Sequence, residues 1–207
     1  MRTYLIKHQN LFYSLILLFA LLTAAVCDGF LAADSVRDEC LRLHIKAASD
    51  SEEDQRIKLL VRDAVLSAGA EYFADNTDAD AAARKIYENK AEIESIANAV
   101  LIENGVPYKA ALSLEEEYFE TREYENFRLP AGKYTACKVV LGEGEGKNWW
   151  CIMFPPLCLP AATEKTDDSV YAVFGENGGD LVTEKGGYKI KFRIVEIVEE
   201  IIEAIKN

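Results

Sequence analysis

Histidine and basic charge are scarce in this chain, and each shortage excludes a class of function. Only His8 and His44 occur in 207 residues, and His8 belongs to an apolar N-terminal segment. A single remaining imidazole excludes His-rich metal sites and any mechanism that needs two histidines. Lysine and arginine number 23 against 35 aspartates and glutamates, which gives a net charge of −12. Such a surface repels nucleic acid and anionic lipid, so nucleic-acid binding is excluded.

The N-terminus has the composition of a secretion signal. Arg2 and Lys7 precede an uncharged and almost wholly apolar run over residues 11–26. This run is short for a bilayer span, and the small residues near Ala25 suit signal peptidase, which we expect to cut there. The alternative is an uncleaved anchor over residues 1–27. In either case the bulk of the chain works outside the cytoplasm.

Hydrophobic periodicity predicts an α+β fold. Residues 41–46 alternate apolar and polar side chains like a half-buried strand, with His44 on the polar face. In the acidic run 49–54 either Ser51 with Asp54 or Asp50 with Glu53 can cap a helix, whose apolar stripe runs from Ile57 to Tyr72. A second helix is expected from near Thr77 to Asn104. The further elements expected are strands over 108–114, 134–141, 149–154 and 188–194, and a closing helix with Val198, Ile201, Ile202 and Ile205. We predict a single exported α+β domain with an antiparallel-rich sheet, packed with two or three amphipathic helices.

The glycine-rich stretch GEGEGK, residues 142–147, resembles a phosphate-binding loop only superficially. A Walker loop needs a glycine four residues before Gly146 and a hydroxyl after the lysine, where the chain has Asn148. Glu143 and Glu145 would also repel phosphate. Phosphate binding is therefore rejected.

A β-hairpin explains this region better, with strands over 134–141 and 149–154 joined by the glycine-rich loop. In the second strand Trp149 and Trp150 point to opposite faces, and both faces are apolar. The pattern favours a central strand covered on both sides. The alternative is a strand that presents one aromatic face to a partner.

Three stretches carry a resemblance to a known family. They are GEGEGKNWWCIMFPPLC at 142–158, RLHIKAASDSEEDQRIKLLVRDAVL at 42–66 and LPAGKY at 129–134. Together they resemble the stage II sporulation protein R family of endospore-forming bacteria. The likeness spans most of residues 37–160, while the acidic segment 115–126 and the tail beyond residue 161 match less well.

The resemblance implies a signalling protein secreted from the forespore into the intermembrane space of the sporangium. There it would activate a membrane-embedded aspartic protease of the mother cell that processes the sigma-E precursor. It implies no catalytic residues, cofactor, metal or small-molecule substrate. On this reading residues 1–27 are the signal peptide or anchor, residues 28–160 the signalling core, and residues 161–207 a loop with a C-terminal strand and helix.

The partner-binding candidates lie in the aromatic strand and at the acid-capped start of the first helix. They are Asn148, Trp149, Trp150, Phe154, Pro155, Pro156, Asp50, Asp54 and Gln55. We expect these residues to act through contact and not through chemistry, since tryptophan and phenylalanine anchors commonly dominate interfaces. The acid run 50–54 lacks the glycine and spacing of a calcium loop, and a helix cap explains it.

Four cysteines follow the signal segment, and in an oxidising compartment they allow three disulfide pairings. We expect Cys151–Cys158, because the two flank a Pro-Pro turn, and closing so short a loop adds on the order of 2–3 kcal/mol. Cys137 competes for Cys151, because a hairpin would place the two diagonally on one face.

The rival function is an exported thiol or carboxylate hydrolase that acts on the cell wall. His44 with Cys151 or Cys158 could supply a base and a nucleophile, with Asn148 or Asp50 as the orienting group. No local signature of a known cysteine protease surrounds either cysteine. A lone histidine on a polar strand face is more typical of a solvated residue or a hydrogen-bonding partner, so we predict that the protein is not an enzyme.

Overall fold

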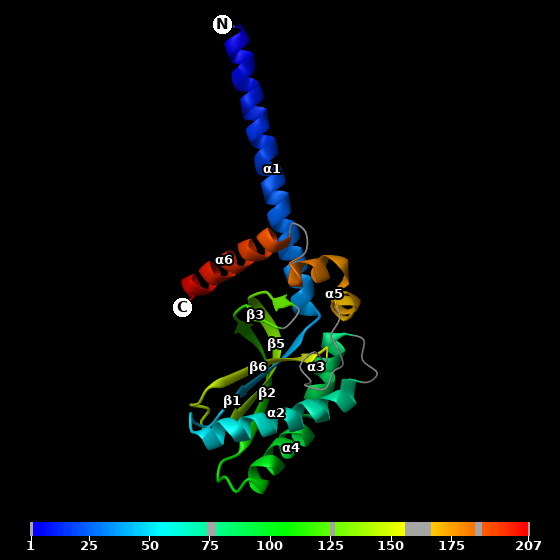
Figure 1. Cartoon of the computed structure of the whole chain (residues 1–207), viewed down its shortest axis with the longest axis vertical. Helices are drawn as coiled ribbons and strands as arrows, with labels where there is room; N and C mark the ends of the chain where they lie inside the picture. Colours follow the sequence, from blue (N-terminus) through cyan, green and yellow to red (C-terminus); the bar gives the residue numbers. More distant parts are fainter. Residues whose placement is uncertain (1, 74–77, 125–126, 156–166, 185–187, 207) are drawn as a thin grey trace.

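The computed structural model describes residues 2–73, 78–124, 127–155, 167–184 and 188–206. A long helix, α1 (Arg2–Asp38), projects from an α+β body (Figure 1). Its stretch Leu11–Asp38 is long and apolar enough to cross a membrane. Residues 11–25 are exposed, whereas the end of α1 packs against the body. The helix is compatible with a signal peptide or with a membrane anchor.

A four-stranded mixed sheet forms the centre of the body. Its strand order is β2 (Ala110–Phe119), β5 (Gly132–Leu141), β1 (Leu41–Lys46) and β6 (Asn148–Phe154). β1 runs parallel to β5, and the other two neighbouring pairs are antiparallel. The predicted α+β class is confirmed, and the sheet is mixed.

The predicted hairpin is wrong, because β1 lies between β5 and β6. The loop 142–147 must therefore cross two strand spacings, about 10 Å, which its six residues span easily. The central strand covered on both sides is β1, whose Arg42 and His44 are as buried as its leucines. β6 stands at one end of the strand order instead of the middle.

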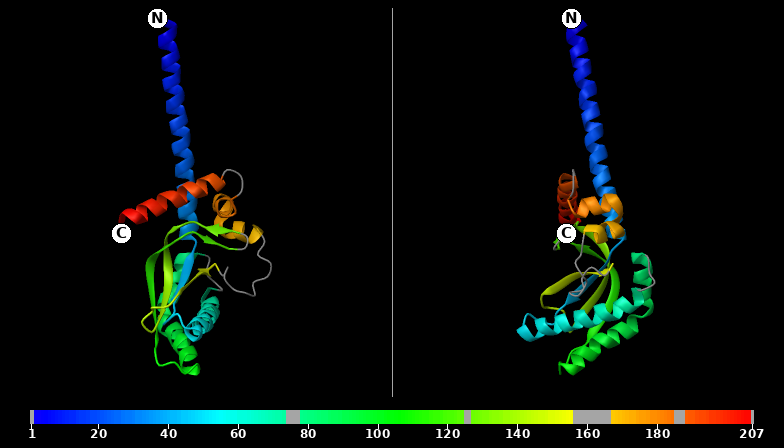
Figure 2. Two further views of the ribbon diagram at one scale, coloured as in Figure 1. Left: turned by 60° about the vertical axis from the view of Figure 1, so that its left-hand side comes forward. Right: turned by 45° about the vertical axis from the view of Figure 1, so that its right-hand side comes forward.

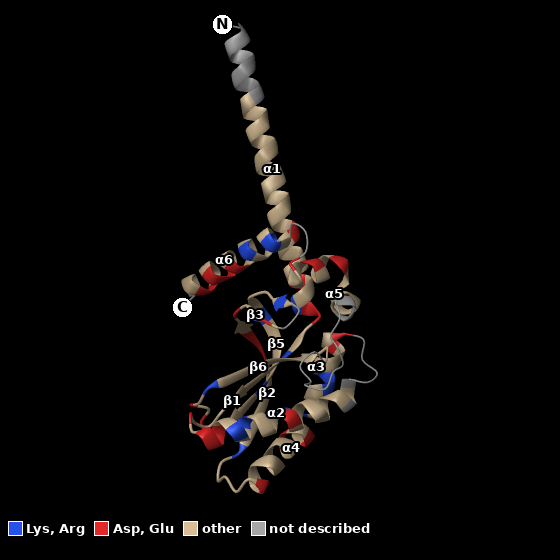
Figure 3. Ribbon diagram, viewed as in Figure 1, with Lys and Arg blue, Asp and Glu red and all other residues tan. Residues whose placement is uncertain are grey.

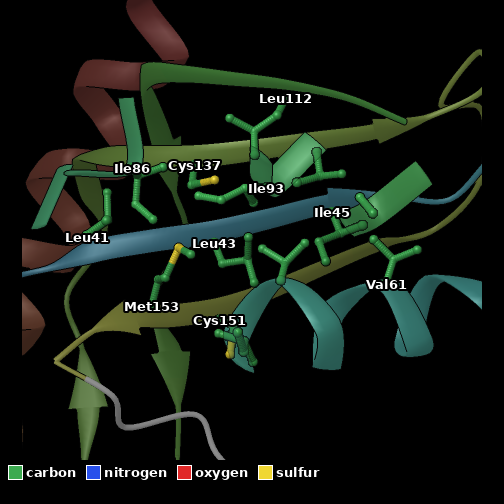
Figure 4. Packing of buried hydrophobic residues seen from close by; sticks show 14 of the residues in the cluster. Leu41, Leu43, Ile45, Val61, Ile86, Ile93, Leu112, Cys137, Cys151 and Met153 are labelled. Carbon is green, nitrogen blue, oxygen red and sulfur yellow. The ribbon is translucent and has the colours of Figure 1, made fainter. Parts of the chain in front are cut away.

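Three helices cover one face of the sheet: α2 (Glu52–Phe73), α3 (Ala79–Glu88) and α4 (Lys90–Glu103). The second predicted helix is thus two helices, which meet at Asn89. Asp78 caps α3 by accepting a hydrogen bond from the Ala81 backbone N–H at 2.6 Å. The core beneath these helices includes Leu41, Leu43, Ile45, Val61, Ile86, Ile93, Leu112, Cys137 and Met153 (Figure 4).

The opposite face of the sheet carries a second, more aromatic cluster. The short strands β3 (Arg122–Glu123) and β4 (Arg128–Leu129) pair beside it, and helix α5 (Asp167–Val182) packs on it. Its buried members include Phe119, Phe127, Leu129, Tyr134, Ile152, Val170 and Phe174. The acidic segment 115–126, given little weight in the sequence, therefore supplies the end of β2 and all of β3 in its described part.

The C-terminal segment forms a helix, α6 (Tyr188–Lys206), so the predicted strand over 188–194 is wrong. The buried residues follow helical spacing instead: Phe192 and Val195 lie one turn apart and pack together against α1. The first turns of α6 pack on α1 where α1 meets the body, and the rest of α6 extends to one side, across the direction of α1 (Figures 1 and 2). The described part of residues 161–207 thus holds α5, which is kinked at Gly175, and α6.

Candidate functional site

The glycine-rich loop between β5 and β6 binds the loop between β1 and α2. Gly146 N–H donates to the Ala47 carbonyl at 2.9 Å, and Lys147 N–H donates to Asp50 Oδ1 at 2.7 Å. Lys58 Nζ, from α2, donates to the Lys147 carbonyl at 3.0 Å. The candidate Asp50 therefore holds two loops together. This structural role accounts for the glycine-rich stretch 142–147 without a bound phosphate.

Gly146 is required by a close approach of two backbones. A Cβ at this position would lie 2.2 Å from the Ser49 carbonyl oxygen. We expect Gly146→Ala to lower the free energy of unfolding by about 2–3 kcal/mol, because a backbone oxygen cannot yield as a side chain can. Urea denaturation measures the change.

Gly105→Ala is the matched control. Gly105 has a φ of +70°, and a Cβ there meets nothing within 4 Å. The control therefore reports backbone strain without a clash, about 1 kcal/mol. Equal losses at the two positions would contradict the role of the loop contact.

Asp54 lies in the first turn of α2 and is held by three side chains. Ser49 Oγ and Tyr108 Oη each donate to its carboxylate at 2.5 Å, and its backbone N–H donates to Ser51 Oγ at 3.1 Å. The hydrogen bonds from Ser49 and Tyr108 lower the pKa of the Asp54 carboxyl. Of the two predicted caps the structure uses Ser51, and the Asp54 carboxylate is bound by side chains of this chain.

Gln55 completes this corner. Its Nε2 donates to the Ser49 carbonyl at 2.9 Å, and its Oε1 accepts from Lys58 Nζ at 2.6 Å. Burial lowers the pKa of the Lys58 ammonium. Asp50, Asp54 and Gln55 thus lie together, and each is engaged within the chain.

Trp149 and Trp150 point to opposite faces of β6, as predicted. Trp149 packs on the helix-covered core, and the Arg62 guanidinium carbon lies 4.5 Å from the centroid of its ring. Trp150 packs on the second cluster and meets Phe119 edge-on, with ring centroids 4.8 Å apart. Both indoles are partly buried.

His44 is the centre of the site on the Trp150 side. Trp150 stacks on its ring with centroids 3.7 Å apart and planes inclined by 17°. His44 Nδ1 lies 2.8 Å from Glu117 Oε2, and Nε2 lies 2.9 Å from Asn148 Oδ1. Lys138 Nζ in turn donates to Glu117 at 3.2 Å. His44 is 3% exposed, so the structure makes it a buried hydrogen-bonding partner and not a solvated residue.

Arg42 lies one step along the same face of β1 and is fully buried. Its Nε donates to the Cys151 carbonyl at 3.0 Å, and its Nη2 donates to Tyr124 Oη at 3.2 Å. The guanidinium carbon lies 4.2 Å from the Phe119 ring centroid and 4.9 Å from that of Tyr134. This is a cation held among aromatic rings.

The geometry gives the thiol-hydrolase reading no support. Cys151 belongs to the helix-covered core, and His44 lies on the other face of the sheet. Cys40 and Cys137 are buried thiols, and burial raises the pKa of each to about 12. His44 also has both ring nitrogens bonded, so among the described residues no base–nucleophile pair is assembled.

The disulfide prediction divides into two parts. Cys137 is a free thiol, so the alternative pairing of Cys137 with Cys151 is wrong, because β1 separates their strands. Cys151 is disulfide-bonded. Cys158 lies outside the described residues, and its pairing with Cys151 stays a prediction.

The remaining candidates are placed as follows. Asn148 is exposed at the start of β6 and reaches His44, whereas Phe154 and Pro155 are buried at its end. Pro156 lies outside the described residues. Over the described ranges, no group of three or more His, Cys, Asp or Glu residues could hold a metal ion.

Sequence reasoning missed Glu117, Lys138 and Arg42 as parts of the site. The signal for Glu117 was available, because the period of two that begins at Ala110 continues through the acidic segment to Phe119. Following it would have placed Glu117 on the His44 side of the sheet. Nothing in the sequence indicated that the buried face of β1 would hold Arg42.

These features define a class: an α+β protein with an apolar N-terminal helix and a buried histidine stacked beneath a partly exposed tryptophan. The family model described as stage II sporulation protein R matches residues 37–164, so the chain belongs to this family. Stage II sporulation protein R of Bacillus subtilis (strain 168) is 38% identical to it over 124 residues. The alignment covers 60% of this chain and 55% of that protein, so the match spans little more than half of the relative. No solved structure matches the chain.

The matched range contains β1 to β6 and every residue of the His44 cluster. Helices α5 and α6 lie beyond its end, and most of α1 lies before its start. The match therefore covers the sheet and helices α2 to α4, whereas α5, which packs on the second face of the sheet, and α6 lie outside it.

Proposed function

We propose that this chain is an exported sporulation signal that activates a membrane-embedded aspartic protease, which then processes the sigma-E precursor. The family match over residues 37–164, which makes the chain a sporulation protein, is the observation that carries the proposal. The place of action is the intermembrane space between forespore and mother cell. The apolar helix α1 supports export, since it has the length and composition of a signal or anchor.

The proposed contact surface is the Trp150 face, defined as Asn148, Trp150, Glu117, Lys138 and Arg122. These side chains are exposed or partly buried, whereas the other face of the sheet is covered by α2, α3 and α4. The Arg122 guanidinium carbon lies 5.8 Å from the Trp150 ring centroid. An aromatic residue bordered by charges is typical of an interface anchor, whose truncation costs roughly 2 kcal/mol or more.

On this proposal the protein acts by binding and not by chemistry. His44 holds Trp150, Glu117 and Asn148 in place, and the disulfide-bonded Cys151 offers no thiolate. Asp50, Asp54 and Gln55 support this face indirectly, by holding the loops that follow β1 and precede β6.

Reconstitution in a non-sporulating host tests the function. The exported chain is co-expressed with the protease and the sigma-E precursor, and precursor cleavage is followed by immunoblot. We expect cleavage when the full chain is exported, and none when residues 1–27 are removed and the rest stays in the cytoplasm. Cleavage that proceeds without the chain, or fails although the chain is exported and folded, would contradict the proposal.

A further inference from the structure

Helix α6 carries an unusual row of exposed isoleucines. Ile190, Ile197, Ile201 and Ile205 follow one another at helical spacing and are between 41% and 79% exposed. Ile194 lies in the same row and is partly buried. Exposed isoleucines cost free energy in water, and burying them against another surface recovers it. A continuous apolar stripe on the uncovered side of a helix therefore indicates a binding face.

The opposite side of α6 fixes which way this stripe points. Glu196 pairs with Arg128 of β4 at 3.4 Å, and Glu199 pairs with Arg37 at 3.3 Å. Arg128 lies in β4, and Arg37 lies in the last turn of α1, where it donates to the Ala131 carbonyl of the body. The isoleucine stripe lies on the other side of the helix from these contacts and so faces away from the body. The apolar part of α1 also projects away from the body at this junction (Figure 1).

The junction with α1 places α6 at a definite depth along that helix. Lys191 pairs with Asp28, and the Lys191 Cβ lies 3.1 Å from the position of a Cβ on Gly29. Phe192 and Val195 pack on α1 in the same small core. From Leu11 to Asp28 the helix rises about 26 Å, close to the thickness of the hydrocarbon layer. α6 thus crosses α1 where a bilayer spanned by α1 would end.

The distribution of charges on α6 is compatible with a position at the membrane surface. Three of its four basic residues, Lys189, Lys191 and Arg193, lie at the end that contacts α1, and its glutamates follow toward the C-terminus (Figure 3). The helix as a whole carries equal numbers of Lys/Arg and Glu. An amphipathic helix of this kind is held at a membrane by its apolar area, without need of anionic lipid.

We propose that α6 is an interfacial helix, which lies flat on the membrane surface with its isoleucine stripe buried at the boundary of the acyl chains. Its contacts with α1 begin at Asp28, after the expected cut near Ala25. The helix therefore keeps the domain at the bilayer whether or not the signal segment is removed. The occupant of the stripe is a lipid surface, and neither a second copy of the chain nor a protein groove.

Spin labels on the full chain in phosphatidylcholine nanodiscs test this. The exposed Cys27 is changed by Cys27→Ser, and a nitroxide is attached through Ile201→Cys or, as the matched control, Glu200→Cys. Both positions are exposed and adjacent in sequence, but the label points to different sides of the helix. We expect the Ile201→Cys label to collide more with oxygen than with a water-soluble nickel chelate. The Glu200→Cys label should show the reverse order.

Three results would overturn the proposal. Equal and high access of the chelate to both labels would leave the stripe in water. High access of oxygen to both labels would bury the whole helix and not one face of it. Dipolar coupling between two Ile201→Cys labels in one disc would show that a second copy covers the stripe.

Discussion

Replacing His44 with alanine should lower the free energy of unfolding by about 3–4 kcal/mol, because the change removes a buried ring that three residues contact. The Trp150 indole loses its stacking partner, and the Glu117 carboxylate and the Asn148 amide each lose a hydrogen bond. The cavity left behind adds to this cost. Urea denaturation of the wild-type and variant proteins measures the difference.

His44→Gln is the matched variant, since an amide keeps hydrogen-bonding capacity but gives up the ring. We expect it to lose less stability than His44→Ala and to retain activation of precursor cleavage in the reconstituted system. A His44→Gln protein that folds normally but does not activate precursor cleavage would contradict the proposal that the protein acts by binding alone. A chemical role for the imidazole would then be the one to pursue.

Arg42→Ala should cost about 3–5 kcal/mol of the free energy of unfolding, because the side chain is fully buried between two aromatic rings. No carboxylate pairs with Arg42 within the described part of the chain, so its positive charge is held by rings and by two hydrogen bonds. A methionine can fill much of the same space without a buried charge. We therefore expect Arg42→Met to recover at least half of the loss.

The comparison of the two Arg42 variants separates packing from hydrogen bonding. If Arg42→Met is as unstable as Arg42→Ala, the bonds to the Cys151 carbonyl and the Tyr124 hydroxyl are the larger contribution, and the packing account fails. Chemical denaturation with a tryptophan fluorescence signal suits this test, because Trp150 lies beside the Arg42 cluster.

Local patterns in the sequence were sufficient for most elements. The alternation of residues 41–46, the Ser51 cap and the helical stripe from Ile57 predict β1 and α2 because each depends on neighbours in the chain. The opposite orientation of Trp149 and Trp150 follows from the period of two alone. Trp150 and Asn148 could be proposed as site residues for the same reason.

Long-range pairing could not be predicted in this way. Nothing local indicates that β1 inserts between β5 and β6, and a glycine-rich loop between two apolar strands is equally typical of a hairpin. The partners of His44 depend on this insertion, because β1 brings His44 beside Asn148 of β6 and within reach of Glu117 of β2. The closing helix was predicted from its stripe at Val198, Ile201, Ile202 and Ile205, but its first turns were taken for a strand because apolar and basic residues alternate over 188–194.

The insertion of β1 between two late strands determines when the domain can fold. The hydrogen bond from Arg42 to Cys151 joins positions 109 residues apart, so the first strand of the sheet has no neighbour until the last two have been made. Sheets with such distant partners form slowly. On the proposed function the chain is exported, and its four-stranded sheet could then be completed only after residue 154 had crossed the membrane.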